Sequence, residues 1–301
     1  MASTTMTFEQ LARQDDVTSN ATLALLQGNP AFTKLSESEG ADIIKRDQED
    51  DTKLAVGIQI AVKKGVLSAN PDVSPVKKID VIGKTADAVA AELISHIPSK
   101  DGNVIILQGL SGTGKGTTVK KLQSILPNCV TWSNGNVFRT FTYLITKHCE
   151  EKGIEFSPAI LTPELLAAQV QRLKFAKFDD GFDVIIDGKL RVDTIANTEL
   201  KKPVISQRVP SVAEQTQGEV VIFAAAAVDV LKQAGCNVIL EGRAQTLQYI
   251  PSPYRFELVI SDVALLGQRR AAQRVMAAAL KSITPSPEAV QKAVLDAAAS
   301  L

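Results

Sequence analysis

Residues 104–119 constrain the fold of this chain more than any other stretch. They open with an apolar run at 104–107, continue through glycines at 109, 112, 114 and 116, and pass into a helical pattern that extends to Ile125. We interpret them as a buried strand, a glycine-rich loop and a helix, which is the context that a phosphate-binding loop requires. In such a loop the glycines let backbone N–H groups point at an anion, and the helix adds the positive end of its dipole.

The side chains of this loop are of the types that hold a polyphosphate. Lys115 would bring a point charge to the terminal phosphates, and the Thr117 hydroxyl would lie near the phosphates and Mg²⁺. In the general motif the Ser or Thr follows the Lys directly, whereas here Gly116 separates them. The alternative is a turn that merely joins strand to helix, and an ion pair that held Lys115 across the loop would favour it. The candidate nucleotide ligands are Gly109, Ser111, Gly112, Thr113, Gly114, Lys115, Gly116, Thr117 and Thr118.

Composition limits the class of protein. The chain has 301 residues, 45% of them hydrophobic, which is enough for one large domain with an extension or for two small domains. Lys plus Arg and Asp plus Glu both number 33, so the formal net charge is zero and gives no signal for nucleic-acid binding through bulk charge. No apolar run reaches the roughly 18–20 residues that span a bilayer.

The cysteines bear on the compartment. Cys129, Cys149 and Cys236 are widely spaced and form neither a disulfide framework nor a metal-binding pattern. This favours the cytoplasm or another reducing compartment. The first residues are rich in Ser and Thr, but Glu9 and Asp16 argue against a transit peptide, so organelle import is disfavoured without being excluded.

Residues 1–100 form a mainly helical extension in this interpretation. We expect two short helices within 8–26, broken at 18–20, and a helix with an apolar face around Leu54 and Ile58. The charged run at 36–51 is typical of a solvated surface. A short strand is expected at 79–83. The extension carries no chemical motif, and its apolar helix faces need a cover, either the main domain, a protein partner or a second copy.

Residues 101–301 have the pattern of an α/β domain. Apolar runs predict further buried strands at 129–132, 237–241 and 256–260. An insert at about 160–213 begins with a helix after Thr162 and continues with strands at 173–178, 182–186 and 190–192, which predicts a small antiparallel sheet. Pro210 should interrupt the helical region that follows, and a long helix should run from Glu214 to Gln233.

Charged residues follow the predicted strands where parallel sheets bind ligands. Arg139 lies one turn into a helix after the strand at 129–132 and could project over this edge of the sheet. Glu241 ends another strand and is placed to hold hydrated Mg²⁺, and Arg243 could reach a substrate phosphate. Three arginines fall partly on one face of the helix that begins at Asp262 and could clamp a transferring phosphoryl group: Arg269, Arg270 and Arg274. The alternatives are a surface position for Arg139, a strand-end ion pair for Glu241 and Arg243, and a solvated face for the arginine-bearing helix.

Taken together, these segments resemble the bacterial-type cytidylate (CMP) kinases of the nucleoside monophosphate kinase group. The resemblance covers roughly residues 103–275. It rests on Gly-Leu-Ser-Gly-Thr-Gly-Lys-Gly-Thr at 109–117, Ser-Asn-Gly-Asn-Val-Phe-Arg at 133–139, the helix and three strands at 162–192, Glu-Gly-Arg at 241–243 and Gln-Arg-Arg at 268–270. It implies a phosphate-loop (P-loop) kinase fold, a three-layer α/β/α sandwich, with ATP and Mg²⁺ bound at the loop. It also implies that Arg139 holds the acceptor phosphate.

Several positions depart from the family pattern. Ala244 replaces an Asp that orients the acceptor nucleoside, and Ala196 and Ala213 lie where acceptor arginines are expected. The lid is shortened to one alanine-rich helix. Two hypotheses follow. The first is an ATP-dependent phosphotransferase acting on a nucleoside monophosphate or similar small acceptor. The second is a catalytically degenerate kinase-like nucleotide-binding protein that serves as a structural subunit of a larger assembly.

Overall fold

The apolar runs predicted as strands assemble into one parallel sheet in the computed structural model, which describes residues 6–14, 16–283 and 287–301. The strand order is β1-β8-β2-β7-β3, and every pairing is parallel. All five residues of the central strand β2 are buried, as expected for a strand covered on both faces. The strands are β1 (Val76–Asp80), β2 (Val104–Gln108), β3 (Cys129–Trp132), β7 (Asn237–Gly242) and β8 (Tyr254–Val259).

Helices cover both faces of this sheet. On one face α4 (Ala86–Ser95) and α5 (Lys115–Ile125) bury the side chains of Ile105 and Leu107. On the other face α9 (Pro203–Gln233) and α10 (Ala244–Leu247) bury those of Val104 and Ile106. The alternation along β2 follows from the two-residue period of a strand. The chain is therefore an α/β protein with a parallel sheet, as the sequence predicts.

The long helix α9 corrects one expectation. Pro210 lies inside it and does not interrupt it. A proline within a helix removes one hydrogen bond and costs about 3 kcal/mol. Val212, Val220 and Leu231 are fully buried along the same helix, and their packing offsets that cost. Tertiary packing overrides local propensity here.

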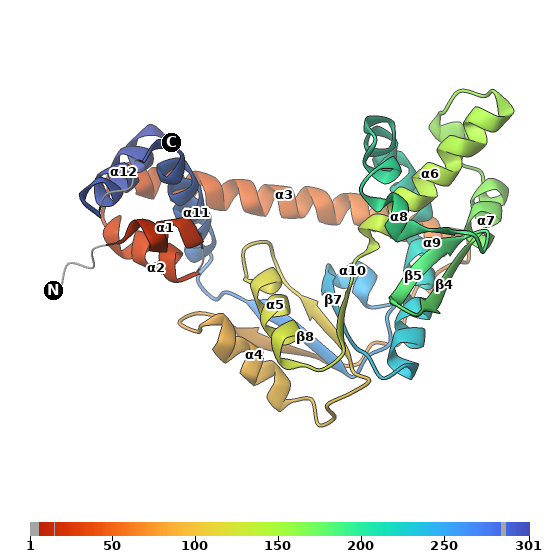
Figure 1. Ribbon diagram of the computed structural model, residues 1–301, viewed down its shortest axis with the longest axis horizontal. Coiled ribbons are helices and arrows are strands. Elements are labelled where there is room, and N and C mark those ends of the chain that lie inside the picture. The colour runs from red at the N-terminus through yellow and green to blue at the C-terminus, as the bar shows by residue number, and fades with distance from the viewer. Residues whose placement is uncertain (1–5, 15, 284–286) are drawn as a thin grey trace.

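The insert has the predicted form. Thr162 caps α7 (Pro163–Gln171), and a three-stranded antiparallel sheet follows in the order β4-β5-β6. These strands are β4 (Leu173–Phe178), β5 (Gly181–Ile186) and β6 (Leu190–Arg191), and the short helices η1 (Pro158–Ile160), α8 (Val192–Ala196) and η2 (Glu199–Lys201) flank them. The insert shares a core with α6 (Asn134–Lys152) and α9, and it forms the right-hand part of Figure 1.

A separate helical cluster joins segments from opposite ends of the described chain. It comprises α1 (Phe8–Arg13), α2 (Asp16–Leu25), the first part of α3 (Pro30–Lys63), α11 (Ala264–Ser282) and α12 (Pro287–Ser300), which share one core of buried side chains. These helices lie together at the left of Figure 1. The break between α1 and α2 falls before Asp16 and not at 18–20 as predicted, because Thr18 and Ser19 are buried within α2.

The helix α3 is one continuous element of 34 residues. Figure 1 shows it running from the helical cluster across the space beside the sheet to the region of α9. At its start Gly40 packs against Gly267 of α11, and near its end Gly57 packs against Gln217 of α9. The edge strand β1 lies within the predicted extension and pairs with β8. The division into residues 1–100 and 101–301 stays a prediction.

No helix in the described part of the chain has the length and hydropathy that crossing a membrane requires.

Candidate functional site

The glycine-rich loop between β2 and α5 adopts backbone angles that favour glycine. Gly109, Gly112 and Gly114 have φ values of 144°, 84° and 86°. At Gly109 an added Cβ would lie 2.5 Å from the Leu258 carbonyl oxygen of the neighbouring strand β8. A side chain at this position would therefore force the loop away from the sheet.

The helix α5 begins at Lys115, and Gly114 at its N-cap provides no side-chain cap. The Lys115 ammonium donates to the carbonyl oxygens of Gly109 and Leu110, each at 2.7 Å. Burial lowers the pKa of Lys115 and so does the charge of Arg243, whereas Glu241 and Asp47 act in the opposite direction. No carboxylate in the described chain lies within ion-pair distance of this ammonium. Lys115 is thus folded onto its own loop.

A carboxylate from α3 lies at the glycine-rich loop. The Ser111 backbone N–H donates to Asp47 Oδ2 at 2.8 Å, and the Ser111 hydroxyl donates to Asp47 Oδ1 at 2.6 Å. Arg243 Nη2 donates to the same Oδ1 at 2.6 Å. Asp47 therefore takes up the kinds of donor that an anionic ligand of this loop would use: a loop amide, a hydroxyl and a guanidinium.

Asp47 corrects the interpretation of 36–51 as a solvated surface. It is 2% exposed, although Arg46 and Gln48 beside it are exposed. Burial acts to raise the pKa of Asp47, but the hydrogen bonds from Arg243 and Ser111 together hold the pKa below its ordinary value. The sequence does indicate that Asp47 faces inward. Counting back from Leu54 by seven and then by four residues reaches Asp47 and Ile43, so the three side chains lie on one face of a helix.

Arg243 lies in an acidic environment. Besides Asp47 it approaches Asp50 at 3.8 Å and Asp51 at 3.7 Å, and its side chain is 22% exposed. Burial acts to lower the pKa of Arg243, and Asp47 and its neighbours raise it. The alternative interpretation of Arg243, a strand-end ion pair with Glu241, is not found among the described residues. Arg243 instead ties β7 to α3.

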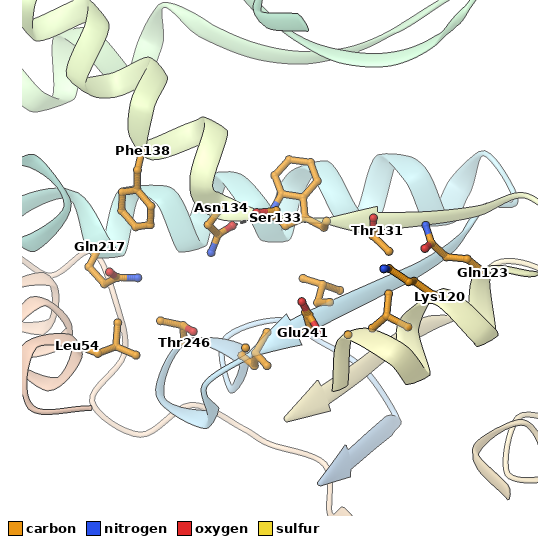
Figure 2. Close-up of a pocket in the computed structure, with 16 residues that line it drawn as sticks. Leu54, Lys120, Gln123, Thr131, Ser133, Asn134, Phe138, Gln217, Glu241 and Thr246 are labelled. Carbon is orange, nitrogen blue, oxygen red and sulfur yellow. Dashed lines mark hydrogen bonds between the residues drawn. The ribbon is translucent and has the colours of Figure 1, made fainter. Parts of the chain in front are cut away.

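A cavity of about 470 Å³ opens beside the loop helix. Figure 2 shows Phe138, Gln217 and Leu54 at one end, Lys120, Gln123 and Thr131 at the other, and Glu241 between them. The volume is within the range of small-molecule sites. The walls come from α3, α5, β3, α6, α9, β7 and α10, with the lining residues Leu54, Gly116, Val119, Lys120, Gln123, Thr131, Trp132, Ser133, Asn134, Phe138, Gln217, Leu240, Glu241, Gly242, Thr246 and Leu247.

The start of α6 is held in place at this cavity by its own polar residues. Trp132 Nε1 donates to Asn134 Oδ1 at 2.7 Å, and the Ser133 hydroxyl caps the helix at Gly135. The insert reaches the cavity only indirectly, because Phe175 packs edge-on against the Trp132 ring. Asn134 is therefore fixed toward the cavity, as Figure 2 shows.

The two candidate metal ligands lie on neighbouring elements. Glu241 is the second-last residue of β7 and pairs with Leu107 of β2, and Thr117 lies in the first turn of α5. No cluster of three or more Asp, Glu, His or Cys suited to a metal ion is found in the described ranges. Mg²⁺ at phosphate sites is held by one or two carboxylates with water and substrate oxygens, so Glu241 and the Thr117 hydroxyl are of the kind that fits.

The contacts found for the remaining predicted arginines within the described ranges are not with the loop. The Arg139 guanidinium lies over Gly135 of its own helix, and an added Cβ there would be 3.2 Å from its Nη1. Arg270 approaches Glu39 of α3 at 3.8 Å. Arg269 is partly buried on the same helix, and no ion pair to it is found among the described residues. Leu266 of α11 does lie close to Gly112, so the first turn of α11 borders the loop.

A comparison with models of known protein families finds no match, and neither does a comparison with curated proteins.

Proposed function

We propose that the chain is an ATP-dependent phosphotransferase with a P-loop kinase fold that uses a small phosphorylated acceptor, such as a nucleoside monophosphate. The observation that carries the proposal is the loop itself. It follows the central strand of a parallel sheet, its glycines at 109, 112 and 114 have positive φ, and Lys115 opens the next helix. A strand, a loop of this kind and a helix are the usual elements of a polyphosphate site.

The roles of the residues follow from their positions. The loop amides and Lys115 would hold and neutralise the terminal phosphates of ATP. In the transfer, an oxygen of the acceptor phosphate bonds to the terminal phosphorus while the bond from that phosphorus to the bridging oxygen of ADP breaks. Phosphoryl transfer needs charge stabilisation and positioning more than covalent help. Glu241 and Thr117 would hold Mg²⁺, which supplies charge neutralisation when bound.

The acceptor would enter the cavity beside α5. Phe138, Leu54 and Leu247 give it apolar walls, and Asn134 and Gln217 offer hydrogen bonds to a planar polar group. Arg139 lies near the start of α6, the helix that carries Asn134, and is the candidate for binding the acceptor phosphate. Arg269 and Arg270 would act from α11.

A second candidate function has its own supporting observation. Ser111 and Lys115 already have partners within the chain, namely Asp47 and two loop carbonyls. A kinase-like protein that has lost catalysis and serves as a structural subunit would tolerate a loop whose polar groups are already paired in this way.

A coupled assay of ADP formation separates the two functions. The protein is incubated with MgATP and a panel of nucleoside monophosphates, and MgATP binding is measured by calorimetry. Lys115→Met should lower turnover by about 100-fold or more, because a preorganised charge at the transferred group is lost. Lys121→Met is the matched control, since Lys121 is on the same helix but pairs with Asp87 at the surface.

The outcomes are distinct. If MgATP binds and every acceptor fails, phosphotransfer is refuted and the structural subunit is favoured. If Lys115→Met and Lys121→Met have equal effects, the loop is not the site of transfer.

A further inference from the structure

Asp47 is the one buried side chain in the described central part of α3, between Ile43 and Gly57. Among the described residues of α3, the buried positions are Phe32, Leu35, Ser36, Glu39, Ile43, Asp47, Gly57 and Ala61. The helix is thus packed near its start and near its end. Between Ile43 and Gly57 the one buried side chain is a carboxylate. A residue that is usually solvated therefore occupies an inward position where an apolar side chain would be expected.

The partners of this carboxylate are the groups that an anionic ligand needs. A backbone N–H has one hydrogen to donate, and that of Ser111 donates to Asp47 Oδ2. The Ser111 hydroxyl and one Arg243 nitrogen are directed at the other oxygen. A phosphate bound in the loop would compete for these donors. It would also place negative charge beside a carboxylate, which is repulsive.

We propose that Asp47 is a built-in competitor of the loop's phosphate ligand, so that α3 holds the site closed until the carboxylate is displaced. This proposal rests on the proposed function, because it needs the loop to bind a polyphosphate. The observations that carry it are the two contacts with Ser111, the contact with Arg243 and the burial of Asp47. Lys115, which donates to the loop carbonyls in the same structure, would be released for the phosphates when the ligand enters.

Calorimetry with MgATP and with inorganic triphosphate tests the proposal on the full chain. Asp47→Asn removes the charge and keeps the shape, and Asp47→Ala removes the side chain. Both variants should bind either ligand about 10-fold to 100-fold more tightly than the unaltered chain, which corresponds to one competing hydrogen bond to a charged group. Asp42→Asn is the matched control, because Asp42 is exposed on the same helix. The affinity of this variant for either ligand should stay within about threefold of that of the unaltered chain.

Hydrogen exchange provides a measurement that needs no variant. If the carboxylate leaves the loop, residues 44–56 lose the contact of Asp47, their one buried side chain. Their amides should then exchange faster with MgATP present than without it. Unchanged or slower exchange with ligand bound would overturn the proposal.

The results also separate this proposal from the proposed function. If the unaltered chain binds MgATP and the two Asp47 variants bind it no more tightly, the competitor is refuted and the nucleotide site stands. If neither the unaltered chain nor either variant binds MgATP or triphosphate, both proposals fail.

Discussion

Replacing Arg243 by alanine tests how firmly α3 is attached at the glycine-rich loop. Arg243 Nη2 lies 2.6 Å from Asp47 Oδ1, and the Asp47 side chain is 3% exposed. Removing one partner of a buried ion pair costs about 3–5 kcal/mol, because the other charge is left without compensation. Since Ser111 would still donate two hydrogen bonds to the carboxylate, we expect a smaller loss of about 2 kcal/mol in the free energy of unfolding.

A double-mutant cycle isolates the contact. Asp47→Ala, Arg243→Ala and the double variant are unfolded in urea and followed by far-UV circular dichroism. The double variant should lose less than the sum of the single losses, with a coupling energy of about 1–2 kcal/mol. Asp50→Ala with Arg243→Ala is the control cycle. That pair is 3.8 Å apart and Asp50 is 53% exposed, so its coupling should stay below about 0.5 kcal/mol. Equal coupling energies in the two cycles would refute the reasoning.

The same cycle has an expected pH dependence. The pKa of Asp47 is lowered in the folded protein, against burial, by hydrogen bonds from Arg243 and Ser111. A group whose folded pKa is depressed stabilises the protein above its unfolded pKa of about 3.9, and loses that contribution as pH falls through the folded pKa. The coupling should therefore be the same at pH 7 and pH 5 and shrink below about pH 4. Coupling that rises on acidification would contradict this assignment.

Three further predictions concern stability and are checked by thermal melting. At Gly267 an added Cβ would overlap the Ser36 carbonyl oxygen of α3, whereas at Gly40 it would make an ordinary contact. Gly267→Ala should thus lower the free energy of unfolding by about 1–3 kcal/mol, whereas Gly40→Ala should leave it unchanged or raise it slightly. Equal melting temperatures for the two variants would contradict the close contact between α3 and α11. Asn237→Ala should cost about 2–4 kcal/mol, because its buried amide bonds Asn103 and two backbone carbonyls. Gly109→Ala should cost about 1–3 kcal/mol through its positive φ and its contact with β8, and a melt like that of the unaltered chain would argue against the loop conformation.

Local patterns were sufficient for most of the fold. The strand at 104–108, the helix after Lys115 and the antiparallel insert sheet follow from apolar runs, helix caps and turn residues. These signals are contained within a few residues, and the burial of each element agrees with them. The parallel sheet and the helices on both of its faces could therefore be predicted from sequence.

The environment of the loop could not be predicted in the same way. Asp47 meets Ser111 across 64 residues and Arg243 across 196 residues of sequence. Within its own segment it is one acid among several charged residues, and such runs are usually solvated. The continuity of α3 through that run decides which acid faces inward. The roles assigned to Arg139, Arg269 and Arg270 stay predictions, because the contacts found for Arg139 and Arg270 in the described chain are with Gly135 and Glu39 and do not test phosphate binding.

The shared core of the helical cluster has a consequence for how the protein is made. The apolar faces of α1 and α2 are buried against α11 and α12, which are synthesised long after them. Domains fold as units during synthesis, and exposed apolar surface on a growing chain is prone to aggregation. The first helices therefore stay without this cover while the residues between Leu25 and Ala264, about 240 of them, are synthesised. We expect their protection during translation to depend on chaperones, and their docking to follow the synthesis of α11 and α12.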